Sequence, residues 1–542
     1  MAKQQAAQRY IFKISTSRLK KAKWNLTLPL SEARANDEVI SLNDSQMLRW
    51  IDELNGVECA EIEVARLKSR IRAVRREPHT LQTKREIRRL YDEIDRLQFK
   101  PDYLHLVIDK DKDLHRACRG FTVNGIKYVR LLGTNGGVKM STIVFVSERL
   151  VNTLRERIDN GRNVDVPQVP AKLEAYRALT CSGSTPVSPP RGILLVPDCE
   201  TEFFEDVITL NDEHGSEPEM EFVENYKVTL DESDGYGLMC PALAERWSQE
   251  LGLDYVASGM NTRFSWEKGM VFTFDFHEFA EKVAGSYIVK DAWGNEVDIR
   301  NVELVLTTSM LKLWKCYDSM EHYLACCRDN HYTFGIPKVC PKELENRRTT
   351  NYQFLQSYSL TDDQIDELIK PTVDELIDVI SGDYRKAILF LRGFSLSEDN
   401  VDPYKTDYAA ALMADPRMYR DPYVRRGIFD MIKKRIDDAK IGVITVHANY
   451  SIASGDPYAL CQSMFGLPVT GLLKAGEIYN RYWADVGAEE VACFRAPMSA
   501  HANIRRLKIA RSEEVLYWYQ YMTTSTLFNA WDSCAAALNG MD

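Results

Sequence analysis

Three cationic side chains and one carboxylate stand in local patterns that could bring them against a phosphate-bearing ligand or a metal ion. Lys268 is followed directly by a glycine, and Lys312 ends the segment Thr-Ser-Met-Leu-Lys. Because glycine adds no bulk, a lysine beside it can lie close to both backbone and ligand. Arg495 begins an Arg-Ala-Pro sequence, and Asp542 follows Asn-Gly-Met. Each residue taken alone is more often a solvated surface group, so the interpretation depends on their occurring together.

A fourth cation, Arg263, lies five residues before Lys268 in the sequence Arg-Phe-Ser-Trp-Glu-Lys-Gly. A separate glycine-rich segment, 133–142, has some features of a phosphate-binding loop. That motif needs glycine directly before its lysine, and here Val138 precedes Lys139. We therefore interpret 133–142 as a tight turn that approaches another backbone segment.

The apolar pattern of the N-terminal part predicts an arm and a sheet. Residues 58–98 have helical periodicity interrupted by Pro78, which predicts a helical hairpin or coiled-coil arm. Residues 66–90 contain ten Lys or Arg against two Glu. A nucleic-acid contact and a merely solvated flank are equally good interpretations of this charge. From residue 103 apolar residues recur at every second position, which predicts strands.

The remaining elements should position the five candidate residues. Residues 190–320 predict an all-β block, which contains Arg263 and both lysines. Residues 345–440 predict helices, with Thr361 as an N-cap. A second β-rich block begins at Ile441 and contains Arg495.

Composition narrows the class of protein. The 542 residues are 45% hydrophobic and 27% charged, as expected for a globular protein of several domains. No apolar stretch approaches the roughly 20 residues of a membrane span, and no secretory signal opens the chain. We expect it to stay in the cytoplasm where it is made.

Twelve cysteines without a C-x-x-C pair argue against a zinc ribbon or a disulfide framework. The net charge of −10 does not exclude a nucleic-acid partner, because the basic residues are segregated.

Several of these segments, in order, are similar to the phage-encoded single-chain RNA polymerases. These polymerases are relatives of the eukaryotic RNA-silencing polymerases and of the two large subunits of cellular RNA polymerase, and they contain double-psi β-barrels. The resemblance runs from about residue 100 to the end of the sequence. The segments that carry it are 133–142, 176–184, 234–244, 263–269, 308–312, 351–368, 494–498 and 537–542.

The resemblance implies a role for each candidate residue. Lys268 and Lys312 would be catalytic cations that contact nucleotide phosphates or the RNA 3′ end, and Arg263 would bind substrate beside them. Arg495 would contact the nucleotide sugar and help select ribose. Asp542 would be the first carboxylate of an Asp-x-Asp-Gly-Asp loop that holds Mg²⁺, the implied cofactor. On this basis the remaining aspartates are expected from a second polypeptide or a C-terminal segment.

The fold implied is an α+β multidomain chain with two double-psi β-barrels, the second incomplete, joined by a helical segment and preceded by a helical arm. We expect an N-terminal region over 1–100, an α/β domain over 101–188 and a first barrel over 189–335. A helical connector over 336–440 and a second barrel over 441–542 would follow.

The function implied is template-directed RNA synthesis from nucleoside triphosphates, with DNA as the favoured template, phage genes as the target and the bacterial host cytoplasm as the location. The partners would be the nucleic-acid template, the RNA product and the nucleoside triphosphates, with no membrane. The alternatives are an RNA-dependent RNA polymerase and an inactive nucleic-acid-binding remnant.

Overall fold

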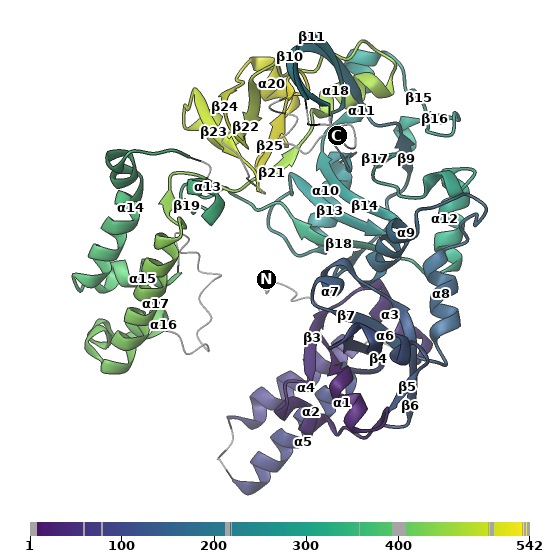
Figure 1. The fold of residues 1–542 in the computed structure, drawn as a ribbon, viewed down its shortest axis with the longest axis vertical. Coiled ribbons are helices and arrows are strands. Elements are labelled where there is room, and N and C mark those ends of the chain that lie inside the picture. The colour runs from purple at the N-terminus through teal and green to yellow at the C-terminus, as the bar shows by residue number, and fades with distance from the viewer. Residues whose placement is uncertain are drawn as a thin grey trace. The chain divides into compact units, whose positions relative to one another are not determined.

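The computed structural model describes residues 8–57, 60–76, 78, 80–211, 217, 219–232, 234–356, 358–392, 408–496, 498, 503–533, 535 and 538. The chain forms two compact units. The first unit contains the described parts of Met1–Asp198, Asp234–Val339 and Cys461–Pro468, and the second contains those of Cys199–Ser233, Cys340–Leu460 and Val469–Asp542 (Figure 1). No helix among the described residues is long and apolar enough to span a membrane.

An N-terminal sheet of seven strands opens the first unit, in the order β2-β5-β6-β7-β4-β1-β3. The strands are β1 (Gln8–Ser15), β2 (Asn25–Leu26), β3 (Val39–Asn43), β4 (Phe99–Val107), β5 (Phe121–Val123), β6 (Ile126–Leu132) and β7 (Thr142–Ser147). The helices are α1 (Thr16–Lys21), α2 (Leu30–Ala35), α3 (Gln46–Leu54), α6 (Asp111–Cys118), α7 (Asn135–Lys139), α8 (Val151–Asp159) and α9 (Pro170–Arg177). Ile14, Leu104 and Phe145 are fully buried in its core, as the period-two pattern predicts for the inner face of a sheet.

The segment predicted as a tight turn contains the short helix α7. Position 137 requires glycine, because a Cβ atom there would lie 2.8 Å from the carbonyl oxygen of Thr142. The backbone therefore does approach another segment closely here. The difference from the prediction is that a single helical turn makes the approach.

The helical arm is confirmed as an antiparallel pair, α4 (Ala60–Val74) and α5 (Leu81–Gln98) (Figure 1). Val64, Leu67, Ile71, Leu90 and Ile94 form its own small apolar cluster. Thr80 caps α5 through a capping box with Thr83, which satisfies backbone N–H groups that the first turn leaves unpaired.

A central sheet follows in the first unit, in the order β9-β17-β12-β14-β13-β18-β8. Its strands are β8 (Thr185–Val187), β9 (Ile193–Val196), β12 (Tyr236–Met239), β13 (Gly259–Phe264), β14 (Glu267–Thr273), β17 (Leu304–Thr307) and β18 (Phe334–Val339). The small pair β15 (Ile288–Lys290) and β16 (Glu296–Asp298) and the helices α11 (Phe276–Phe279) and α12 (Met320–Asp329) complete this part.

The interpretation of 190–320 as all-β is wrong, because helix α10 (Pro241–Glu250) follows β12. Pro241 opens the helix where no backbone donor is needed. Leu243, Ala244 and Trp247 are fully buried at helical spacing. The helical period extends over too few residues to stand out between strands of similar length.

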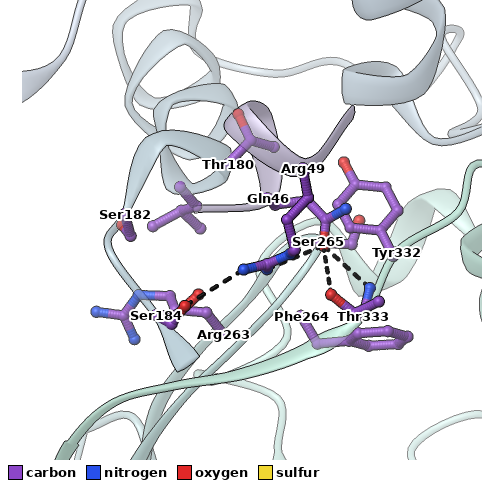
Figure 2. Close-up of a pocket in the computed structure, with 11 residues that line it drawn as sticks. Gln46, Arg49, Thr180, Ser182, Ser184, Arg263, Phe264, Ser265, Tyr332 and Thr333 are labelled. Carbon is purple, nitrogen blue, oxygen red and sulfur yellow. Dashed lines mark hydrogen bonds between the residues drawn. The ribbon is translucent and has the colours of Figure 1, made fainter. Parts of the chain in front are cut away.

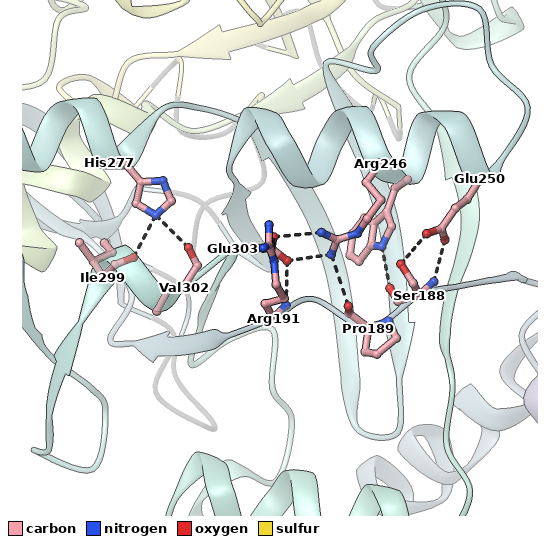
Figure 3. A network of polar contacts seen from close by, with 10 residues as sticks. Ser188, Pro189, Arg191, Arg246, Glu250, His277, Ile299, Val302 and Glu303 are labelled. Carbon is pink, nitrogen blue, oxygen red and sulfur yellow. Dashed lines mark hydrogen bonds and ion pairs between the residues drawn. The ribbon is translucent and has the colours of Figure 1, made fainter.

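A charged network fixes α10 against the entry to the central sheet (Figure 3). The Glu303 carboxylate, beside β17, accepts from Arg191 Nε at 2.7 Å and from Arg246 Nη2 at 2.7 Å. Its pKa falls to about 2, chiefly because of the hydrogen bond with Arg246. The pair of arginines thus holds helix α10, strand β9 and strand β17 together by one ionised carboxylate.

The second unit contains a long hairpin, a helical part and a C-terminal sheet. The hairpin is β10 (Glu200–Asn211) with β11 (Glu219–Asp231), and a two-stranded ladder joins β19 (Arg348–Thr349) to β20 (Thr445–Val446). The helices are α13 (Tyr352–Gln356), α14 (Asp362–Ile380), α15 (Tyr384–Arg392), α16 (Tyr408–Ala414) and α17 (Pro422–Lys440). Thr361 caps α14 as predicted, in a capping box with Gln364.

The C-terminal sheet has five strands in the order β21-β25-β22-β24-β23. They are β21 (Ile452–Ser454), β22 (Glu477–Asn480), β23 (Glu490–Phe494), β24 (Ile504–Ile509) and β25 (Ser525–Phe528), with helices α18 (Pro457–Met464), α19 (Arg481–Asp485) and α20 (Glu513–Trp518) between them. From edge to edge the neighbours pair parallel, antiparallel, parallel and antiparallel.

Five of the seven strands of the central sheet repeat this topology. β9-β17-β12-β14-β13 also pair parallel, antiparallel, parallel and antiparallel. When β8 and β18 of the central sheet are set aside, the first, fifth, second, fourth and third strands in chain order are neighbours in both sheets, and the strands are numbered in this way below. The domain boundaries predicted at residues 100, 188, 335 and 440 remain predictions.

Candidate functional site

Arg263 and Lys268 are register partners across the hairpin of β13 and β14. The turn between the strands is tight, and Ser265 takes a left-handed conformation with φ +53°. Directly opposed residues project from the same face of a sheet, with Cβ atoms about 5 Å apart. The hairpin therefore places the guanidinium and the ammonium group on one face.

Lys312 joins this face through backbone hydrogen bonds. The Lys268 N–H donates to the Met310 carbonyl oxygen at 3.1 Å, and the Lys312 N–H donates to the Trp266 carbonyl oxygen at 3.2 Å. Glu267 and Leu311 form an isolated antiparallel bridge between the same two segments. The segment that follows β17 thus pairs with the hairpin tip.

The three cations lie close enough to influence one another. Burial lowers the pKa of Lys268, and the positive charges of Arg263 and Lys312 lower it further, while Asp234 acts in the opposite direction. Burial also lowers the pKa of Arg263. The structure therefore brings together the three residues that the sequence identified separately. An anion bound among them would relieve their mutual repulsion.

The packing beneath the cations requires glycine. Met310 is fully buried, and its side chain lies against Gly237 and Gly269. A Cβ at Gly269 would lie 2.4 Å from the Gly235 carbonyl oxygen and 2.5 Å from Met310 Cε. The glycine after Lys268 thus allows a close backbone approach, as its sequence context predicts.

Glu267 is a buried carboxyl group that sequence reasoning missed. It is 0% exposed, and Thr262 Oγ1 donates to one of its oxygens at 2.5 Å. The other oxygen, Oε2, has no hydrogen-bond partner among the described residues. Burial raises its pKa to about 7, against the opposing effects of Thr262 and Arg263. Only the strand register, which turns Glu267 inward, could have indicated this.

A small pocket lies beside Arg263, between the central sheet and the N-terminal part of the same unit (Figure 2). Arg49 reaches into it, donating to the Ser184 carbonyl oxygen at 3.3 Å and to Asp44 at 2.8 Å. Gln46 accepts from the Thr333 N–H at 3.0 Å. These contacts attach α3 to the chain around β8 and β18 and so support the strand that carries Arg263.

Arg495 lies at the end of β23 in the second unit and is exposed. Its Nη1 donates to the Leu538 carbonyl oxygen at 3.3 Å. The neighbouring Phe494 packs on Phe354 with ring centroids 4.7 Å apart. The structure therefore brings Arg495 to the segment that leads toward Asp542, while Asp542 itself lies outside the described residues.

The described residues contain no group of three or more His, Cys, Asp or Glu side chains arranged to hold a metal ion. A carboxylate such as Asp542 is the donor type that Mg²⁺ prefers. One carboxylate supplies only part of the coordination that this ion requires. The Mg²⁺ site therefore stays a prediction that concerns Asp542.

The fold is that of a multidomain α+β protein in which one of two sheets with the same strand topology carries three clustered cations. The sequence comparison identifies its family. Residues 70–515 match the family described as RNA dependent RNA polymerase, so the chain belongs to that family.

One relative is the DNA-directed RNA polymerase YonO of Bacillus phage SPbeta. It is 26% identical over 376 residues, which cover 67% of this chain and 42% of the relative's own length. A solved structure, the RNA dependent RNA polymerase QDE-1 from Thielavia terrestris, is similar with a TM-score of 0.50 and 14% identity. That match covers 80% of this chain and 47% of the other.

These findings confirm two predictions. The chain is a member of the double-psi β-barrel polymerase superfamily that the sequence segments indicated. Its fold is the α+β multidomain type with two barrel sheets, the central sheet and the C-terminal sheet. The chain spans less than half the length of either relative.

Proposed function

We propose that this chain contributes to template-directed RNA synthesis, joining nucleoside triphosphates with release of pyrophosphate. The observation that carries the proposal is the cluster of Arg263, Lys268 and Lys312 on one face of a sheet in a polymerase fold. None of the three forms an ion pair with a carboxylate within the described part of the chain. A group of cations without carboxylate partners, in which Lys268 is exposed and Arg263 and Lys312 are half-buried, is suited to a polyanion such as a triphosphate.

In this proposal each group has one role. Lys268 and Lys312 bind the phosphates and offset the charge that develops on them during transfer. Arg263 adds a third positive charge beside them. Arg495 contacts the ribose and favours it over deoxyribose. Asp542 is assigned to Mg²⁺, which when bound activates the RNA 3′-hydroxyl and neutralises the triphosphate.

We favour DNA as the template and phage genes as the target, in the cytoplasm of a bacterial host, because the phage relative is described as DNA-directed. RNA is the second candidate template, because the matched family and the similar solved structure are described as RNA-dependent. We also propose that a C-terminal segment or a second polypeptide supplies the aspartates that complete the metal site with Asp542. An inactive remnant that only binds nucleic acid is the third candidate.

The decisive experiment is RNA synthesis by the complete polymerase on DNA and RNA templates of the same sequence. The proposal expects a labelled RNA product on DNA, dependent on Mg²⁺ and lost in Lys268→Ala. A product on RNA alone would select the RNA-dependent alternative. Nucleic-acid binding without a product on either template would select the remnant.

A further inference from the structure

Asp198 lies two residues beyond the end of β9 and is half-buried at the edge of the central sheet. Its carboxylate accepts from Thr308 Oγ1 at 2.5 Å and from the Ser309 N–H at 2.8 Å, and it also accepts from Ser309 Oγ. One carboxylate therefore holds both residues that follow β17.

Ser309 extends the contact to a third segment. Its Oγ accepts from the Gly235 N–H at 2.8 Å. Because a hydroxyl has one hydrogen, and an ionised carboxylate can only accept, that hydrogen is directed to Asp198. The start of β12 and the segments after β9 and β17 thus meet at one serine, whose orientation Asp198 sets.

Lys312 depends on the same residue. Its Nζ donates to the Ser309 carbonyl oxygen, and its N–H donates to Trp266. Between Ser309 and Lys312, the buried Met310 fills the space over Gly237 and Gly269. The position of the ammonium group is therefore coupled to Ser309 through both the side chain and the backbone.

We propose that Asp198 is a positioning residue that fixes Lys312 for contact with the triphosphate of the nucleotide. The inference rests on the proposed function, because it assigns Lys312 to phosphate. A carboxylate suits this position better than its amide. An asparagine oxygen could accept from the Thr308 hydroxyl and the Ser309 N–H, but its NH₂ would then face Ser309 Oγ, whose hydrogen would lose its acceptor. Asp198 itself does not touch the substrate.

The test measures ATP binding to the 542-residue chain by calorimetry in a double-mutant cycle of Asp198→Ala and Lys312→Ala. Asp198→Ala should weaken ATP binding on the order of tenfold, as misplacement of a contact does. In the Lys312→Ala background the same change should add less than about twofold, because two residues that act through one contact are not additive. Asp298→Ala is the matched control, since Asp298 is a half-buried carboxylate that caps a turn in the same unit.

The outcomes separate the two hypotheses. If Lys312→Ala binds ATP normally, the proposed role of Lys312 fails. If Lys312→Ala weakens binding but Asp198→Ala does not, or if the two losses multiply fully, only the positioning role is overturned. If Asp198→Ala does not fold, Ser309→Ala replaces it in the cycle, because it removes the shared hydroxyl alone; the same coupling is then expected, and its absence overturns the inference.

Discussion

The central and C-terminal sheets have one strand topology and both carry cations on the hairpin of the third and fourth strands, but the segment after the fifth strand carries opposite charge. In the central sheet, the hairpin of the third and fourth strands carries Arg263 and Lys268, and the segment after the fifth strand carries Lys312. In the C-terminal sheet, the equivalent hairpin carries Arg495, and the segment after the fifth strand leads toward the carboxylate Asp542. The comparison teaches that this topology fixes where functional groups emerge and leaves their charge open.

The two sheets also anchor these segments differently. An aspartate stands two residues after the first strand in each sheet, Asp198 after β9 and Asp456 after β21. Asp198 holds the segment after the fifth strand, whereas Asp456 is buried and binds the Tyr519 hydroxyl and the Leu472 N–H. The pKa of Asp456 is raised because burial outweighs these hydrogen bonds.

In the C-terminal sheet, the hairpin of β10 and β11 contributes to the anchoring. Thr201 donates to the Ala530 carbonyl oxygen at 2.7 Å, and Glu205 accepts from the Ser533 N–H at 3.1 Å. The segment that leads toward Asp542 is thus attached to residues inserted between two strands of the other sheet. The C-terminal sheet also holds this segment through its own residues, because Asp532 accepts from the Gly476 N–H at 2.7 Å. The difference between the two sheets is that the hairpin of β10 and β11 adds a further anchor to the segment that leads toward Asp542.

The largest effect should come from removing the cations of the central sheet. Lys268→Ala or Lys312→Ala should lower kcat/KM for RNA synthesis by the complete polymerase roughly 100-fold or more, because each removes charge stabilisation in the transition state. The melting temperature should change little, since neither lysine forms an ion pair in the described part of the chain. Steady-state kinetics and thermal melting measure both.

Lys290→Ala is the control, because Lys290 is an exposed lysine on β15 of the same unit. A variant that lacks both Lys268 and Lys312 and synthesises RNA at the full rate would break the comparison. The central sheet would then be only a scaffold.

The arm offers a contrast to both sheets, because its basic residues are exposed and far more numerous. Four of them that form no ion pair among the described residues are suitable for neutralisation to Gln: Lys68, Arg72, Arg85 and Arg89. If the arm contacts a duplex backbone, the slope of log K against log salt should flatten by about 3 to 4, or about 0.9 per contact. Binding measured from about 50 to 200 mM salt tests this.

A matched variant neutralises four exposed basic residues of α17: Arg425, Arg426, Lys433 and Lys434. It should leave the slope nearly unchanged. Equal slopes for the arm variant and the parent chain would show that the arm is a solvated helical pair, and the sheets would then carry all of the nucleic-acid contact.

Part of this arrangement could be predicted from sequence. The order of the segments around Lys268, Lys312 and Arg495 indicated the family, and the glycine after Lys268 indicated a close backbone approach. Local patterns also predicted the arm and the cap of α14 at Thr361. All of these are signals within a few residues of one another.

The rest depends on pairing between distant segments. β9 pairs with β17 across about a hundred residues, and no local pattern encodes that partner. The burial of Glu267 depends on the register of a hairpin whose turn, Ser265-Trp266, is not a characteristic two-residue turn. The role of Asp198 becomes visible only when the ends of three strands are brought together.

Arg495→Lys should sharpen the role of the C-terminal sheet with a smaller effect. Arginine presents a planar fork of donors that lysine cannot copy. The preference for ribonucleotides over deoxyribonucleotides should fall by roughly tenfold, equivalent to the loss of about 1.4 kcal/mol. Competitive incorporation by the complete polymerase measures the ratio.

Arg506→Lys provides the control for this change, because Arg506 lies on β24 of the same hairpin and pairs with Glu490. An unchanged ratio in Arg495→Lys would remove Arg495 from the sugar site. The two sheets would then differ in anchoring alone.

The smallest effect on RNA synthesis, and the sharpest test of how the sheets differ internally, concerns their buried carboxyl groups. The pKa of Glu267 is raised from 4.5 to about 7, so the folded state favours its protonated form. That contribution to stability is complete below pH 4.5 and is lost as the pH rises through about 7, at a cost of ~3 kcal/mol. Glu267→Gln keeps an acceptor for Thr262 and cannot ionise. It should therefore melt like the parent chain at about pH 5 and at a higher temperature at about pH 8.

Asp456→Asn is the matched change in the C-terminal sheet, and it should have the opposite sign. Both Asp456 oxygens accept hydrogen bonds, one of them from the Leu472 N–H at 2.8 Å, and an amide NH₂ in that place leaves this donor without an acceptor. The expected loss is about 1–3 kcal/mol at both pH values. Thermal melting of the two variants at these two pH values shows whether the two substitutions change stability in opposite directions. If Glu267→Gln is destabilised at the higher pH as much as Asp456→Asn, then Glu267 is an ionised and fully paired carboxylate. In that case its negative charge would partly neutralise the positive charge of the cations beside it.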